Sequence, residues 1–516
     1  MEHFDVVVVG AGLSGIGAGY RLQTECPERS YVILEARDAI GGTWDLFRYP
    51  GVRSDSDMFT LGYPFRPWRA PKAIADGDTI RDYIRDTAKQ YRIEDKIRFG
   101  TRVVGADWSS EQARWTVTVE QVEQVEQVEQ VEQVEQVEQT TPAADGARRT
   151  VQRRTLTCDF LYSCAGYYDY EAGYTPDFPG LADFGGTVVH PQFWPEDLDY
   201  ADRRVVVIGS GATAVTLVPS LARDAAHVTM LQRSPTWISP VPGRDKIADR
   251  LRAVLPPKVA HRVIRAKNIA FTIGVYQFCR RRPEAARRLF TKLATRFLKD
   301  EQLVREHFTP SYNPWEQRLC AAPDADFFRA IRGGKADVVT DHIERFVPEG
   351  ILLTSGKVLE ADVVVTATGL RLLAFGGIAP RVDGEEVPLS EQFVWRGAMV
   401  TGIPNFAVCI GYTNASWTLR GDLTSRLVCK VLNHMAARGY PAVVPVPDGT
   451  LRERPLLDLN SGYIQRSIQE FPRAGHRSPW RVRQNYIVDA ATTMRTDLDK
   501  TLRPARREAA KTGARS

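Results

Sequence analysis

Two glycine-rich turns have the composition and spacing to bind phosphate groups. The first spans residues 10–15, reads G-A-G-L-S-G, and directly follows the apolar run at residues 5–9. Gly10 permits a tight turn, Gly12 lets the backbone approach a pyrophosphate, and Gly15 lets helix and strand pack closely. The following helix would direct its unpaired N–H groups and positive partial charge at the phosphates. This turn therefore predicts a dinucleotide site.

The second turn, residues 209–214, reads G-S-G-A-T-A and differs from the first in how its next strand ends. The second strand of the first unit ends in Glu35, whereas that of the second unit ends in Gln232-Arg233-Ser234. A carboxylate binds a ribose diol, as in FAD or NAD, whereas a cation and a hydroxyl suit the 2′-phosphate of NADP. One FAD site and one NADPH site indicate a reductive flavoenzyme.

Each turn sits in a strand–turn–helix–strand unit, and two such units predict two dinucleotide-binding domains. A third apolar strand is expected at residues 361–365, and residues 243–308 have a helical pattern broken at Pro256-Pro257 and Pro283. The predicted fold is α/β, with two Rossmann-like domains and an inserted helical subdomain. The expected boundaries are 1–185 and 375–516 for the FAD domain, 186–240 and 316–374 for the NADP domain, and 241–315 for the helical subdomain.

A low-complexity insert repeats Val-Glu-Gln seven times over residues 119–139. On a helix, each Val of a three-residue period moves by about 60° round the axis, so no apolar stripe forms. On a strand, an odd period alternates between the two faces. Strand-like runs flank the insert, so we expect an enlarged, exposed and dispensable hairpin tip. A frayed helix remains the alternative, because Glu and Gln are good helix formers.

Length and composition suit a large intracellular enzyme. A chain of 516 residues predicts two or three domains, and no apolar stretch is long enough to span a bilayer. The N-terminus enters an apolar strand without a secretory signal, so a cytoplasmic location is expected. Seven cysteines with no C-x-x-C spacing argue against a disulfide framework or a metal site. The sequence carries no signal for the oligomeric state.

Positive charge is concentrated in one window. Between Arg244 and Asp300 the chain has 16 Lys and Arg against four acidic residues, although the net charge of the whole chain is only +5. One interpretation is a solvated helical face that guides an anionic cofactor. The other is peripheral contact with an anionic membrane surface. No nucleic-acid partner is expected.

Flavin-dependent oxygenases and reductases can both combine an FAD domain with an NADP domain, so further motifs must distinguish them. Residues 41–55 contain G-G-x-W, then Y-P-G and an Asp, and residues 184–195 follow F-x-G-x-x-x-H-x-x-x-W-P. Both resemble fingerprints of the Baeyer–Villiger class of flavoprotein monooxygenases. Residues 42–50, 312–315 and 411–419 resemble the branch of that family that activates thioamide prodrugs. The resemblance covers nearly the whole chain apart from the insert.

The resemblance implies a set of cofactor-binding residues. At FAD it places, with the glycines of the first turn, Ser14, Glu35, Thr43, Trp44, Asp45, Leu46, Asp55 and Val103. At NADP it places Arg53, Ser54, Asp55, Gly209, Ser210, Gly211, Ala212, Thr213, Ala214, Val215, Arg233 and Ser234.

The resemblance also places the active-site arginine at Arg318. In the family, the reduced flavin binds O2 as a C4a-peroxide, which needs a fixed nearby cation, as does the oxyanion formed from a ketone. Asp55 would hold the guanidinium and balance its charge. Some relatives have Lys where this chain has Gln317, so the preference for NADP depends mainly on Arg233. His190 is expected to order the hinge between domains by hydrogen bonds.

The activity that this resemblance implies is NADPH-dependent insertion of one oxygen atom from O2. The substrates would be small-molecule ketones, which give esters, and sulfides or thioamides, which are oxidised at sulfur. NADPH would reduce the flavin and remain bound as NADP+. Two enzymatic alternatives stay open: a flavin monooxygenase restricted to nitrogen and sulfur, and a pyridine-nucleotide disulfide reductase, against which the lack of C-x-x-C argues. A non-enzymatic NADP sensor is a further alternative.

Overall fold

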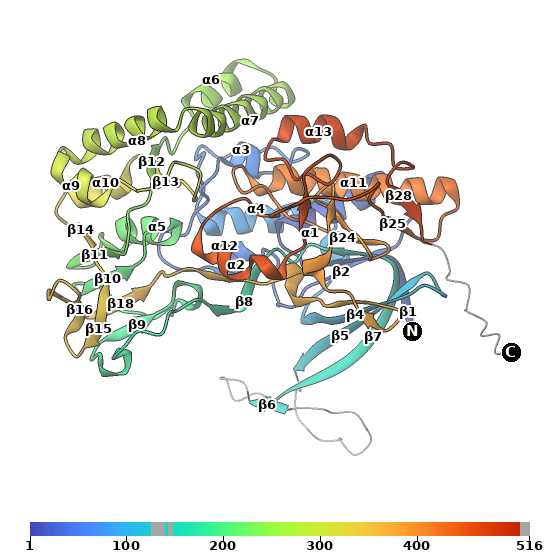
Figure 1. Cartoon of the computed structure of the whole chain (residues 1–516), viewed down its shortest axis with the longest axis horizontal. Helices are drawn as coiled ribbons and strands as arrows, with labels where there is room; N and C mark the ends of the chain where they lie inside the picture. Colours follow the sequence, from blue (N-terminus) through green and yellow to red (C-terminus); the bar gives the residue numbers. More distant parts are fainter. Residues whose placement is uncertain (125–139, 143–147, 506–516) are drawn as a thin grey trace.

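The computed structural model describes residues 1–124, 140–142 and 148–505 (Figure 1). Two α/β units lie side by side, and a row of helices runs along one edge of both. Each unit is built on a parallel β-sheet core, as the sequence predicts.

The first unit is centred on β1 (Glu2–Val9), which pairs in parallel with β2 (Tyr31–Leu34) and β7 (Arg148–Ser163). Alternate β1 side chains, such as Val6 and Val7, enter different hydrophobic clusters on the two faces of the sheet. Burial on both faces explains why the strand is a continuous apolar run rather than an alternating one. Helices α1 (Leu13–Glu25) and α11 (Trp417–Arg438) pack together over one face.

An antiparallel extension continues this sheet through β4 (Thr101–Ser109), β5 (Arg114–Gln124) and β7. The first two Val-Glu-Gln repeats belong to β5, and their backbones pair with β7 as far as Gln124 opposite Arg149. This pairing confirms the predicted hairpin, but residues 119–124 belong to its strand rather than to its tip. Its predicted exposed tip, residues 125–139, lies outside the described residues.

The second unit is a five-stranded parallel sheet in the order β14-β11-β10-β18-β9. Its strands are β10 (Arg204–Ile208), β11 (His227–Gln232), β14 (Ala336–Thr340), β18 (Val363–Thr366) and β9 (Thr187–Val189). Helix α5 (Ala212–Leu221) follows the second glycine turn, and α10 (Asp326–Arg332) packs against it. β18 begins two residues later than expected.

Two strands join the units: β8 (Tyr168–Gly173) and β19 (Leu370–Leu372) pair as an antiparallel ribbon. Two of the connections between the units therefore run side by side as one hydrogen-bonded ribbon.

The helical layer contains α6 (Lys246–Val254), α7 (Pro257–Arg281), α8 (Pro283–Leu298) and α9 (Glu301–His307). Pro257 and Pro283 stand at the first helical positions, where their missing N–H groups cost nothing. α6 and α7 pack into the core of the first unit, whereas α8 and α9 pack into that of the second. The layer thus bridges both units. None of the helices in the described ranges combines the length and apolar character needed to cross a membrane.

Candidate active site

A cavity of about 1340 Å³ lies where the carboxyl ends of the parallel strands of both units face each other. Both glycine turns line it, as expected for ligands bound at the carboxyl edges of open α/β sheets. Its volume exceeds the ~300–1,000 Å³ typical of a pocket for one small ligand. The cavity is therefore larger than one small ligand needs, and a glycine turn from each unit lines it.

The first turn is rigid and closely packed. Gly10 has a φ of +98°, and a Cβ atom on Gly15 would lie 1.8 Å from the Gly10 carbonyl oxygen. Glu35 is buried, and its carboxylate accepts hydrogen bonds from the Ala11 N–H at 2.6 Å and the Arg37 N–H at 2.9 Å. Burial raises the pKa of Glu35, while these two donors oppose the rise by stabilising the charged form. Glu35 is therefore fixed in place by the turn itself.

The second turn also begins with a positive-φ glycine, but the residues that follow its second strand are more exposed. Gly209 has a φ of +130°, and a Cβ atom there would lie 2.3 Å from the Ala367 carbonyl oxygen. The Ser210 hydroxyl donates to the Ser234 carbonyl at 3.3 Å. Arg233 and Ser234 are exposed, and within the described ranges Arg233 forms no ion pair. The guanidinium of Arg233 is therefore free to meet an anion.

Most residues predicted for the site line this one cavity. They are Gly10, Gly12, Ser14, Glu35, Thr43, Trp44, Leu46, Arg53, Ser54, Asp55, Val103, Gly209, Ser210, Gly211, Ala212, Thr213, Arg233, Ser234 and Arg318.

Four predicted residues lie behind the lining instead: Gly15, Asp45, Ala214 and Val215. Gly15 serves the close packing of α1 on β1, and Ala214 and Val215 are fully buried in the core of the second unit. The cofactor-binding prediction treated every residue of each motif alike. Helix periodicity turns the side chains of Ala214 and Val215 towards the core rather than the cavity.

Asp45 is almost fully buried and acts as an anchor for arginines. Its carboxylate accepts from Arg37 at 2.5 Å and from Arg85 at 2.9 Å. Arg37 follows β2 and lines the cavity. Asp45 therefore holds a cation at the cavity wall rather than facing the cavity itself.

Arg318 and Asp55 form an ion pair on the cavity wall. Arg318 precedes β13 (Cys320–Pro323), and Asp55 lies in the loop after α2 (Thr43–Leu46), so the pair joins distant segments. Their side chains are 31% and 33% exposed. The Asp55 carboxylate raises the pKa of the Arg318 guanidinium well above its usual range, so this cation persists at any working pH.

The loop carrying Asp55 is clamped between the two units. A Cβ atom on Gly51 would lie 1.8 Å from the Ser220 Oγ of α5, which allows no side chain there. Arg53 forms an ion pair with Asp326 at the start of α10. These contacts fix the loop that carries Asp55 against the second unit.

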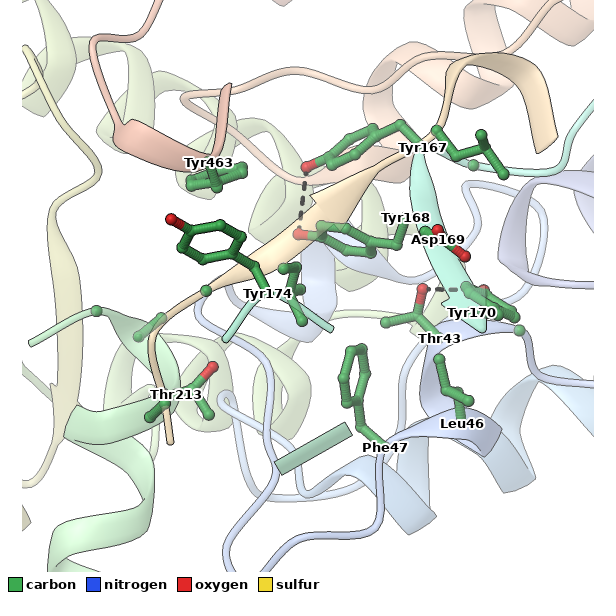
Figure 2. Close-up of a pocket in the computed structure, with 18 of the residues that line it drawn as sticks. Thr43, Leu46, Phe47, Tyr167, Tyr168, Asp169, Tyr170, Tyr174, Thr213 and Tyr463 are labelled. Carbon is green, nitrogen blue, oxygen red and sulfur yellow. Dashed lines mark hydrogen bonds between the residues drawn. The ribbon is translucent and has the colours of Figure 1, made fainter. Parts of the chain in front are cut away.

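A group of tyrosines on the cavity wall was missed by the sequence analysis (Figure 2). The hydroxyls of Tyr167 and Tyr168 lie 3.4 Å apart, and the Tyr170 hydroxyl lies 3.3 Å from the Thr43 Oγ1. Tyr463 comes from α12 (Gly462–Ser467). Burial raises the pKa of Tyr170 to about 12, so its hydroxyl stays protonated.

One sequence signal could have found three of them. Tyr167, Tyr168 and Tyr170 directly follow the carboxyl end of β7, which neighbours β1 in the sheet. Ligands bind at that edge of a parallel sheet. No local pattern marks Tyr463, which reaches the cavity from near the C-terminus.

His190 lies at the linker, as expected. Its Nδ1 accepts from the Gln192 N–H at 3.2 Å, and its ring fills the space that a Cβ atom on Gly173 of β8 would need. It is absent from the cavity lining. This contact packs the linker that carries His190 against β8, one of the strands that join the two units.

Comparison with known families agrees with this geometry. The family described as flavin-binding monooxygenase-like matches residues 4–244. FAD-containing monooxygenase EthA of Mycobacterium tuberculosis is 49% identical over 98% of this chain and 99% of its own length. The probable FAD-binding monooxygenase AlmA of Acinetobacter baylyi is 43% identical over 95% of this chain and 93% of its own.

Solved structures share the fold at lower sequence identity. An oxidised steroid monooxygenase bound to NADP has a TM-score of 0.68 at 22% identity, covering 86% of this chain and 88% of its own. An open cyclohexanone monooxygenase has a TM-score of 0.67 at 20% identity, covering 87% and 91%. From the identity over almost its whole length, this chain belongs to the family of flavin-binding monooxygenases.

Proposed function

We propose that this enzyme uses FAD and NADPH to insert one oxygen atom from O2 into ketones, giving esters, and to oxidise sulfur in sulfides or thioamides. One observation carries the proposal. A permanent cation, Arg318, lies on the wall of the single cavity that both glycine turns share. A disulfide reductase exchanges electrons through a closely spaced cysteine pair, and the sequence contains no C-x-x-C.

The residues present fit the two cofactors. Gly10, Gly12, Ser14 and Glu35 would hold the adenosine diphosphate part of FAD, because positive-φ glycine and a buried ribose acceptor suit it. Thr43, Trp44, Leu46 and Val103 would also contact FAD, with Asp45 acting through Arg37.

NADPH would bind at the second turn. Gly209 to Thr213 would contact its phosphates, backed by the buried Ala214 and Val215, and Arg233 and Ser234 would hold the 2′-phosphate. Arg53 and Ser54 would contribute from the facing loop.

The bound flavin, once reduced by NADPH, supplies the activation of O2. Arg318 would stabilise negative charge that develops on oxygen in the transition state, including the oxyanion made from a ketone carbonyl. Asp55 would orient the guanidinium and Arg318 would donate from fixed N–H groups. Tyrosine hydroxyls and rings beside this pair would orient the substrate and limit access by water.

The substrate class is inferred from this cation and from relatives. Cyclohexanone monooxygenase is named for a ketone and shares the fold. A guanidinium that donates hydrogen bonds beside an aromatic wall suits a carbonyl on an apolar skeleton, whereas sulfur oxidation makes no carbonyl oxyanion. The two reactions should therefore depend on Arg318 to different degrees.

As part of the same proposal, we assign residues 1–185 and 375–516 to the FAD domain, 186–240 and 316–374 to the NADP domain, and 241–315 to a helical subdomain. A cytoplasmic location is proposed because every cysteine is a free thiol.

The test measures NADPH consumption with and without a panel of ketones and thioethers, with products identified by mass spectrometry. Ester formation from a ketone supports the proposal. Oxidation of sulfides alone would identify a monooxygenase restricted to heteroatoms, and consumption that no substrate alters would refute both.

A further inference from the structure

Large apolar side chains are exposed on the helical layer. In the part of the chain that the structure describes, Phe271 is 69% exposed and Val254 is 75% exposed. Six such side chains lie on α6 and α7: Ile247, Val254, Val259, Val263, Phe271 and Phe278. We call this set the apolar ridge. Helices α6 and α7, which carry the ridge, lie at the outer edge of the molecule in Figure 1.

Helix α7 presents this ridge in a fixed orientation. Val259 and Val263 stand one turn apart, and the exposed Ala266 and Ala270 continue the same strip. Phe271 and Phe278, two turns apart, share the neighbouring flank of the helix, about 100° round its axis. On the inner side the buried Arg265 donates to the carbonyls of Phe59 and Gly62, each at 2.8 Å.

The surface around the ridge is basic. α7 contains no acidic residue, and its exposed cations are Lys258, Arg262, Arg280 and Arg281. None of these four pairs with a carboxylate among the described residues. Two of the four acids in the window, Asp245 and Asp249, are already paired with Lys267 and Arg244. The field outside α7 is therefore strongly positive.

We propose that this face docks on an anionic lipid bilayer, with the apolar ridge entering the headgroup region and the cations pairing with lipid phosphates. An exposed apolar strip flanked by unpaired Lys and Arg is the pattern of an interfacial helix. A symmetric dimer would bring the same cations face to face with few acids to neutralise them. Nucleic acid would engage the cations but leave the ridge in water.

Docking would place the cavity wall next to the lipid. On the inner side of α7, Ile269 packs against Tyr412, and Ile273 and Ala415 join the same cluster. Tyr412 and Ala415 line the cavity. The bilayer would therefore lie one helix away from the site. The docking does not depend on the reaction proposed above.

Sedimentation of the full-length holoenzyme with vesicles tests the proposal. We expect binding to phosphatidylglycerol–phosphatidylcholine vesicles, weakened by salt, and little binding to phosphatidylcholine alone. The triple variant Arg262→Glu, Arg280→Glu, Arg281→Glu should weaken binding by at least roughly tenfold. Phe271→Ser with Phe278→Ser should weaken the binding that remains in high salt.

Matched controls use exposed residues elsewhere. Lys335→Glu with Lys357→Glu, and Phe99→Ser with Val446→Ser, should bind vesicles like the parent. Thermal melting and flavin content verify that each variant is folded. Equal binding to both vesicle types, or unchanged binding by both the arginine variant and the phenylalanine variant, would overturn the proposal. A phenylalanine variant that alters only the oligomeric state would assign the face to a second copy instead.

Discussion

The two glycine turns share one backbone plan but differ in the residue that follows the second strand. In the first unit, Glu35 is buried and accepts hydrogen bonds from the Ala11 and Arg37 N–H groups. In the second unit, Arg233 is exposed and has no ion-pair partner in the described ranges. Glu35 is therefore part of the internal hydrogen bonding of the fold, whereas the guanidinium of Arg233 is available to bind a ligand.

A buried acceptor such as Glu35 suits a cofactor that stays bound, and an exposed guanidinium such as that of Arg233 suits a cofactor that binds and dissociates. A preformed, buried acceptor loses little freedom when a ribose arrives, whereas an exposed guanidinium attracts a phosphate from a distance. The Arg318–Asp55 pair stands between the turns, with each member on a different segment. In the proposed function, this pair is the element that would join the two nucleotide sites into one catalytic cavity.

The largest effect should come from disrupting the Arg318–Asp55 ion pair. Arg318→Ala should lower ester formation by about 10²–10³, the usual cost of losing one electrostatic stabiliser. FAD content should persist, because the first turn is untouched, and sulfur oxidation should fall less. Stopped-flow reduction followed by product analysis separates these steps. Asp55→Ala should act in the same direction but more mildly, and full ester turnover in Arg318→Ala would put the oxygenation site elsewhere.

The second turn should respond through affinity alone. Arg233→Ala should raise the KM for NADPH roughly 10- to 100-fold, because a charge-assisted hydrogen bond contributes about 1.5–3 kcal/mol. The KM for NADH should barely change. Steady-state kinetics with both coenzymes make the comparison, and Lys335→Ala on the same sheet is the control. Equal losses for both coenzymes would contradict the assignment of the 2′-phosphate.

A substitution at Glu35, beside the first turn, should lower the stability of the protein as well as its retention of FAD. Glu35→Gln puts an amide NH2 against one of two backbone N–H donors, which should cost about 1–3 kcal/mol. We expect a lower melting temperature and weaker FAD retention, both measured on the purified protein. Arg233→Ala should leave the melting temperature unchanged. A normal melting temperature in Glu35→Gln would mean that the two turns differ less than their contacts indicate.

The smallest effect should come from the repeat, which contributes to neither turn. Deleting residues 122–139 should leave flavin content and both KM values unchanged, and alter stability by less than about 1 kcal/mol, since loop length costs little entropy. Flavin absorbance and steady-state turnover provide the measurement. Loss of FAD on deletion would show that the repeat supports the first unit.

Local patterns in the sequence were sufficient to predict the two α/β units and their glycine turns. Strand–turn–helix order, the glycine spacing and the change from Glu35 to Arg233 are all encoded within short windows, because backbone conformation and ribose recognition are local properties. The helix breaks at Pro257 and Pro283 follow from proline geometry in the same way. Arg318 and Asp55 came from family motifs, since no short window contains both.

The tertiary structure alone decided which side of each element faces the cavity. Asp45 proved to be a buried anchor for Arg37, and Val215 proved to be core, because packing partners come from distant segments. Tyr463 enters the site from the opposite end of the chain. Phe271 is apolar in sequence like any core residue, yet it is exposed. Periodicity reveals that a helix has faces, but only the neighbours that the fold supplies determine which face is covered.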